Sequence, residues 1–173
     1  MFKRTSNRWM SNIRFLLPAA ALAIGGMLAS PSHAAGTVVN VSLWDKGAGM
    51  EMPTDLGFPA SGKDVSKVTM GIAVSTDNVK AGEVTFEVLN SSKDTVHEVI
   101  VARLKNATTP LPYLASDMKV DEDKAGVHLG EVSELDPGKT GALRLDLKPG
   151  IYLLYCDLPA HYMAGMWTLF TVK

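Results

Sequence analysis

Three side chains able to bind metal follow one another at five-residue steps near the end of the chain. Cys156 is followed by His161 and then by Met166. They offer a thiolate, an imidazole and a thioether, which are soft or borderline metal ligands. Because an extended chain spans about 3.3 to 3.6 Å per residue, the three converge on one ion only if the segment folds back as a compact loop. Pro159 and Gly165 favour such a loop.

This mixture of donors is typical of copper. Thiolate and thioether suit Cu(I), imidazole suits both oxidation states, and a long, weak bond to Met is a feature of copper electron-transfer sites. Structural zinc sites usually contain C-x-x-C pairs, whereas this sequence has one cysteine. Other interpretations remain open: Cys156 could be an inert buried thiol, Met166 could be core filler, and Met163 could compete with it as a ligand.

A fourth ligand is expected from a different strand. His97 begins the apolar segment HEVIV directly after a polar turn, which is the position of a residue at the end of a sheet. His128 is the competitor, but it lies in an irregular segment, AGVHLGEV, and is interpreted as a surface residue.

The elements that would position these residues are short strands. The expected strands are 37–44, 68–74, 83–90, 97–104, 140–147, 151–156 and 167–173. Turn signals separate several of them, and residues 46–62 form a glycine-rich loop. Residues 105–135 are expected to be loops with room for one short helix. The pattern indicates an all-β fold, a Greek-key antiparallel β-sandwich.

The order of these motifs resembles the cupredoxin family over nearly the whole chain after residue 35. The segment VKAGEVTFEVLN is followed by His97, then by KPGIYLLYC ending at Cys156, and then by His161 and Met166. The spacing C-x4-H-x4-M is similar to the ligand loop of rusticyanin and sulfocyanin. The resemblance implies one copper ion that cycles between Cu(I) and Cu(II), with three equatorial ligands and Met166 as the weak axial ligand. Those three are His97, Cys156 and His161.

The resemblance also implies one-electron transfer, not catalysis. The partners would be redox proteins such as cytochromes or a terminal oxidase or reductase, and the edge of His161 would be the electron exit. No hydrolytic motif or phosphate loop is present in the sequence. Glu98 departs from the family, in which several members carry a small polar residue after the first histidine, and its carboxylate could change the colour and potential of the site.

Two further functions remain open. Met50 and Met52 could form an accessory Cu(I) site, which would fit a periplasmic copper-tolerance protein that binds or delivers copper. Both methionines could equally be ordinary loop residues. A copper-free sandwich that binds other proteins is the third possibility.

The N-terminus predicts export. Residues 1–34 have a basic start, an apolar run from Phe15 to Ala29 and small residues before an expected cleavage after Ala34, as in a signal peptide. The run is short for a membrane-spanning helix, although an uncleaved anchor remains an alternative. Residues 35–173 would then be one periplasmic cupredoxin domain, monomeric and without a stable membrane anchor. Its 13 basic and 18 acidic residues give a net charge of −5, which disfavours nucleic acid as a partner.

Overall fold

The computed structural model describes residues 36–173, and the expected signal peptide lies outside this part of the chain. The described residues contain eleven strands and one 3-10 turn, η1 (Val65–Lys67). The strands are β1 (Thr37–Asp45), β2 (Met70–Val74), β3 (Asn78–Val79), β4 (Gly82–Asn90), β5 (His97–Leu104), β6 (Tyr113–Leu114), β7 (Lys119–Val120), β8 (Val127–Leu135), β9 (Thr140–Leu147), β10 (Gly150–Tyr155) and β11 (Trp167–Val172). The expected all-β fold is confirmed for this part of the chain.

Two sheets make up the sandwich, and a two-stranded hairpin lies beside them. One sheet has the order β2-β1-β4-β9, the other β3-β11-β10-β5-β8, and β6 pairs with β7. Most neighbours are antiparallel, but β1 pairs with β4 and β3 pairs with β11 in parallel. The sheets are therefore mixed, which differs from the antiparallel sandwich that the sequence predicts. Parallel neighbours are not joined by tight turns, so turn signals do not reveal them.

The main core lies between the two sheets. In β4 the buried residues alternate with more exposed ones, as expected for a strand with one face on the core. The first six residues of β5 are all buried. Its outer face, with Ile100 and Ala102, belongs to a second apolar cluster that also contains Leu111, Val120 and Tyr162. The segments around β6 and β7 therefore cover the outside of the five-stranded sheet, which explains the continuous apolar run in β5.

The clearest difference from the sequence expectation is β8. The sequence predicts loops and room for a short helix over 105–135, yet residues 127–135 form a nine-residue strand paired with β5, and this segment contains no α-helix. The register shifts where Gly130 pairs with Val101 and His128 with Ala102, which leaves Leu129 as an extra residue. This bulge breaks the alternation of polar and apolar residues by which a strand is recognised.

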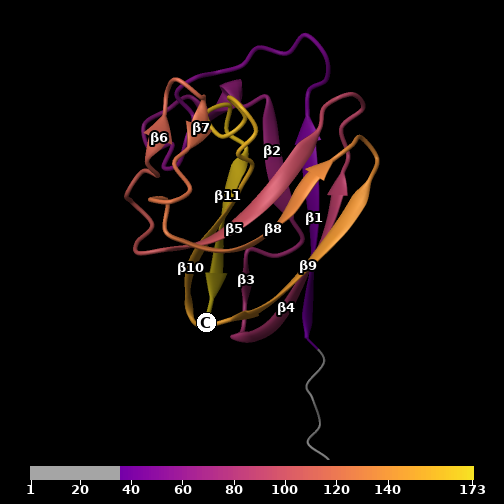
Figure 1. Ribbon diagram of the computed structural model, residues 1–173, viewed down its shortest axis with the longest axis vertical. Helices are drawn as coiled ribbons and strands as arrows, with labels where there is room; N and C mark the ends of the chain where they lie inside the picture. Colours follow the sequence, from indigo (N-terminus) through magenta and orange to yellow (C-terminus); the bar gives the residue numbers. More distant parts are fainter. Residues whose placement is uncertain (1–35) are drawn as a thin grey trace, which may run out of the picture. The chain divides into compact units, whose positions relative to one another are not determined.

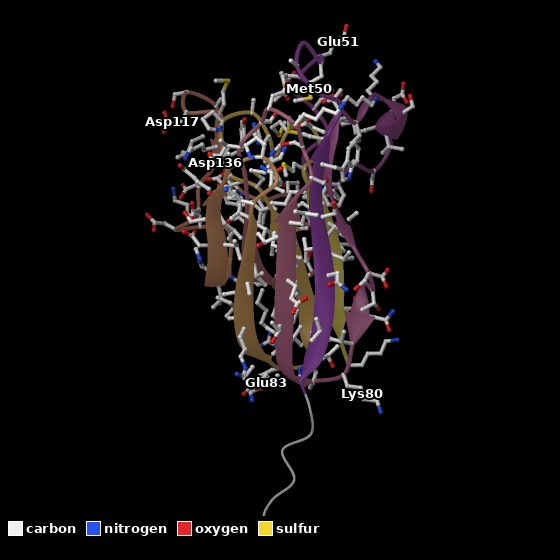
Figure 2. All side chains as sticks on the ribbon, turned by 90° about the vertical axis from the view of Figure 1, so that its right-hand side faces the viewer. Met50, Glu51, Lys80, Glu83, Asp117 and Asp136 are labelled. Atoms are coloured by element: carbon white, nitrogen blue, oxygen red, sulfur yellow. The ribbon has the colours of Figure 1, made fainter. Side chains whose placement is uncertain are left out.

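Three strand ends meet at one end of the sandwich. β1 ends at Asp45, β5 begins at His97, and β10 ends at Tyr155, immediately before Cys156. The loop between β10 and β11, drawn in yellow, lies at the upper end of the sandwich in Figure 1, close to the β6–β7 hairpin. Figure 2 shows Met50 at this end and Lys80 and Glu83 at the other. Among the described residues, no helix is long and apolar enough to cross a membrane.

Candidate metal centre

The site begins with the register of β5 and β10. Tyr155 pairs with Ile100 on one side and with Trp167 of β11 on the other. One step further along the chain, Cys156 has left β10 at the end of the sheet where β5 begins with His97. Cys156 and His97 are both completely buried. The antiparallel pairing therefore brings together two residues that are 59 positions apart in the sequence.

The segment from Cys156 to Met166 folds back into a compact loop, as its spacing predicts. The amide of Cys156 donates to the carbonyl of Met166 at 3.1 Å, and the amide of Met166 donates to the carbonyl of His161 at 3.1 Å. Gly165 has a φ of 100°, and a Cβ there would meet Val68, so only glycine suits this position. The backbone of all three candidate ligands in the loop is therefore tied together.

Three side chains converge within this loop and the neighbouring strand. His97 Nδ1 lies 3.3 Å from His161 Nδ1, and Cys156 Sγ lies 3.4 Å from the same His161 atom. His97, Cys156 and His161 each offer one ligand atom, and these atoms all lie within 4.8 Å of one another. The structure thus brings together three of the four residues that the sequence singles out, each with a potential ligand atom directed toward the others.

Met166 and Met163 pack in two different apolar clusters. Met166 is fully buried in the main core cluster, which also contains Cys156. Met163 packs instead with the second cluster, and its Sδ lies against Gly57, where a side chain would clash with it. This packing favours Met166 over Met163 as the thioether that accompanies Cys156.

The two imidazoles are held in the neutral form. Burial lowers the pKa of His97, against the opposing effect of Asp45. Burial, together with the neighbouring His97, lowers the pKa of His161 to about 4. Because an unprotonated nitrogen is needed to bind a metal, both rings are ready to act as ligands at neutral pH.

The thiol of Cys156, unlike the ligand nitrogens of the two rings, keeps a proton that a metal would have to displace. Burial raises its pKa to about 12, although the backbone amides of Glu98 and Leu158 hydrogen bond to the sulfur and oppose the rise. The sulfur therefore carries a proton at neutral pH in the protein without a metal, and a metal must displace that proton to bind there.

Two acidic residues support the site from the sides. Asp45 Oδ2 lies 2.9 Å from His97 Nε2, although no sequence motif singles Asp45 out. The only feature of the sequence that could have indicated Asp45 is its place at the end of the first strand. On the other side, the carboxylate of Glu98 accepts a hydrogen bond from the amide of Asp157 at 2.9 Å. Glu98 thus ties β5 to the loop after Cys156, a connection that sequence alone does not indicate.

His128, the competitor of His97, lies elsewhere. Its ring is exposed on β8, with Nδ1 3.3 Å from Glu122 and Nε2 3.9 Å from Glu131. These three side chains also form a group with metal-ligand atoms, but all three are exposed and are explained by ordinary surface ion pairing. The interpretation of His128 as a surface residue is confirmed.

No family model matches the chain. No curated protein gives a significant match. Among solved structures, dithionite-reduced auracyanin from the photosynthetic bacterium Roseiflexus castenholzii is 17% identical, with 81% of this chain and 98% of that chain covered and a TM-score of 0.45. Rusticyanin from Thiobacillus ferrooxidans is 16% identical, with coverages of 80% and 79% and a TM-score of 0.48.

The chain resembles the cupredoxins. A second structure, of reduced rusticyanin, is 17% identical over 81% of this chain and 82% of that chain, with a TM-score of 0.49. Because sequence identity to these cupredoxins is low, the ligands and the function of this chain must be argued from its own residues.

Proposed function

We propose that this chain binds one copper ion through His97, Cys156, His161 and Met166 and transfers single electrons. The observation that carries the proposal is the convergence of two imidazole nitrogens and one thiol sulfur in a buried site with neutral rings. Copper bound there would supply a Cu(II)/Cu(I) couple. The protein's part is to hold the donors in one arrangement for both oxidation states, so that little rearrangement accompanies electron transfer.

The spacing of the donors supports a transition-metal ion. Bonds of about 2.0 Å to nitrogen and about 2.3 Å to sulfur, at angles between tetrahedral and trigonal, require donor separations of about 3.3 to 3.8 Å. Within that range two nitrogens lie about 3.3 to 3.5 Å apart and a nitrogen and a sulfur about 3.5 to 3.7 Å apart. The observed 3.3 Å between the two nitrogens lies in its interval, and the observed 3.4 Å between sulfur and nitrogen is about 0.1 Å shorter than its interval. A thioether of Met166 in the same core as Cys156 favours copper over zinc.

The surroundings of the site support electron transfer over catalysis. His97 and Cys156 are completely buried, and His161 is 9% exposed. Such a site leaves no room for a substrate at the donors, whereas an electron needs only a short path through the ring of His161. We therefore place the electron exit at His161 and the partner's docking surface beside Pro159 and Ala160 of the same loop.

The proposed function also implies where the protein acts and which proteins exchange electrons with it. Residues 1–34 act as a cleaved signal peptide, residues 35–173 form a monomeric periplasmic domain, and the partners are cytochromes or a terminal oxidase or reductase. The apolar run from Phe15 to Ala29 and the net charge of the remaining chain support this assignment.

The test is a visible absorption spectrum of the purified protein with Cu(II), together with its copper content. We expect one copper per chain and an intense thiolate-to-copper charge-transfer band, which Cys156→Ser should abolish. The matched controls are Met163→Leu, which should keep the band unchanged, and Met166→Leu, which should shift it. A colourless wild-type protein would refute the proposal.

A copper-tolerance role remains the alternative, and it rests on Met50 and Met52. Met50 packs against the main core, and Met52 is 36% exposed. This role requires Cu(I) beyond one ion per chain, so it is tested by the Cu(I) stoichiometry of the wild type and of the double variant Met50→Ala with Met52→Ala. A stoichiometry of one in both proteins would exclude the accessory site.

A further inference from the structure

Asp45 and His97 form a buried contact between the two sheets. Asp45 Oδ2 lies 2.9 Å from His97 Nε2, and the two side chains are 1% and 0% exposed. Asp45 ends β1 of the four-stranded sheet, whereas His97 begins β5 of the five-stranded sheet. An ionised carboxylate has only acceptor oxygens, so His97 Nε2 is the donor of this hydrogen bond.

The direction of this hydrogen bond determines the tautomer of His97. With its proton on Nε2, the neutral ring has its lone pair on Nδ1. That atom faces His161 Nδ1 at 3.3 Å, within the candidate metal centre. Asp45 therefore selects the one tautomer of His97 that directs a lone pair into the site.

Asp45 is itself fixed in place by other contacts. Its second oxygen, Oδ1, accepts a hydrogen bond from the amide of Gly47 at 2.7 Å. Its backbone pairs with Met70 of β2, and the next amide, that of Lys46, donates to the carbonyl of Thr69 at 2.9 Å. The strand pairing fixes the backbone of Asp45, and its carboxylate cannot turn away from His97 without breaking the hydrogen bond from Gly47, so His97 has a rigid partner.

We propose that Asp45 is the positioning residue of the first histidine and stabilises copper(II) relative to copper(I). This inference rests on the proposed copper function. A carboxylate that accepts the remote N–H of a ligating histidine makes the ligand nitrogen more basic. Its negative charge also lies in surroundings from which water is excluded, where it favours the more highly charged ion. Both effects act in the same direction and lower the reduction potential.

The first test compares Asp45→Asn with the wild type in copper-loaded protein. Asparagine keeps an acceptor oxygen on a side chain of the same size but removes the charge. We expect the affinity for Cu(II) to fall about tenfold more than the affinity for Cu(I), consistent with the 10- to 100-fold effects of such partners on metal affinity. A tenfold change in this ratio raises the potential of a one-electron couple by about 59 mV. Chelator competition in both oxidation states and a redox titration provide the measurements.

The matched control is Glu51→Gln. Glu51 is exposed at the same end of the sandwich as Met50 and loses the same unit of charge when replaced (Figure 2). We expect no change in the potential of this variant, because water and salt screen an exposed charge. If Asp45→Asn also leaves the potential unchanged, or weakens both oxidation states equally, Asp45 has only a structural role and the inference is overturned.

A second test uses the metal-free wild type and does not depend on copper. Nitrogen-15 NMR of the histidine rings should show His97 with its proton on Nε2, and Asp45→Ala should alter that tautomer preference. A wild-type ring with its proton on Nδ1 would overturn the inference. A wild-type protein that binds no copper but has the Nε2–H tautomer would instead refute the proposed function while preserving the positioning by Asp45.

Discussion

The two histidines of the site are the same kind of side chain in different settings. His97 begins a strand, is completely buried, and is held at Nε2 by Asp45. His161 lies in the loop between β10 and β11 and is 9% exposed. Burial lowers the pKa of both, so they are alike in charge at neutral pH. They differ in what anchors them: two sheets hold His97, and one short loop holds His161.

This difference indicates that the strand side and the loop side of the site have different roles. The strand side gives the site its rigidity, because moving His97 would disturb both sheets. The loop side is held by its own backbone hydrogen bonds and by contacts from outside, such as the amide of Ala160 donating to the carbonyl of Met118 at 2.8 Å and the amide of Asp157 donating to Glu98. Under the proposed function, the loop side would contact a partner protein, while the strand side holds the geometry.

The largest expected effect is on stability in the metal-free protein. His97→Ala should cost about 3 kcal/mol of unfolding free energy, because it leaves the carboxylate of Asp45 buried without its partner. His161→Ala should cost less, about 1 kcal/mol, because it leaves no buried carboxylate without its partner. Urea unfolding provides both values, and adding Asp45→Leu to His97→Ala should recover part of the loss. Equal costs for the two histidines would contradict the comparison.

The next effect concerns electron exchange on the loop side. Pro159 is exposed two residues before His161, so Pro159→Glu places a charge beside the proposed electron exit. The rate of electron self-exchange between oxidised and reduced copies should fall about tenfold, which corresponds to about 1.4 kcal/mol in the barrier. NMR line broadening of mixed oxidation states provides the rate.

The control for this charge is Ala81→Glu. Ala81 is exposed and lies next to Lys80, at the opposite end of the sandwich (Figure 2). The variant should leave the self-exchange rate unchanged. A similar decrease in both variants would mean that total charge, not the position beside His161, controls the exchange.

A smaller effect distinguishes the carboxyl groups on the two sides of the site. On the loop side, burial raises the pKa of Asp157 to about 7. On the strand side, burial would also raise the pKa of Asp45, but hydrogen bonds from Thr95, His97 and Gly47 outweigh it, and the pKa is lowered. The loop carboxyl therefore gains a proton near neutral pH, whereas the strand carboxylate stays charged.

The raised pKa of Asp157 makes stability depend on pH. Its ordinary value is 3.8, so the folded protein holds a proton that the unfolded chain releases between about pH 4 and pH 7. Stability from this group is therefore present below pH 4 and is lost as the pH rises toward 7. Relative to Asp157→Asn, the metal-free wild type should lose stability on the order of 1 kcal/mol over this range. Urea unfolding at several pH values measures the difference, and a constant difference from pH 4 to pH 8 would contradict it.

The smallest expected effect is the number of protons released when copper binds. Because both histidines are neutral and Cys156 is protonated at pH 7, copper binding should release one proton from the thiol and none from the rings. Calorimetric titrations in two buffers with different ionisation enthalpies give the number. Cys156→Ser should release none. Release of two or more protons would mean that the rings are charged before copper binds.

Much of the site could be predicted because its information is local. The spacing of Cys156, His161 and Met166 lies within eleven residues, and the turn signals around 136–138 and 148–150 delimit the strands before it. β9 and β10 occur almost where the sequence places them. His97 could be chosen over His128 because a polar turn precedes a continuous apolar strand there.

The remainder could not be predicted because it depends on contacts distant in sequence. β8 has no clear sequence signal because the bulge at Leu129 disrupts its alternation. The parallel pairing of β1 with β4 has no local signal, since no turn joins the two strands directly. The loop spacing already favours Met166 over Met163, but only the structure shows that Met166 shares the main core with Cys156 while Met163 packs in the second cluster.

The amino-acid sequence by itself determined the donor types, their spacing and the strands that lead to them, because these depend on side-chain chemistry and on local backbone preference. Only the tertiary structure decided that Asp45 meets His97, 52 residues away and in the other sheet. The reason is that a hydrogen bond between two sheets depends on how the sheets pack. That packing is set by the whole core, and no short segment of the sequence contains it.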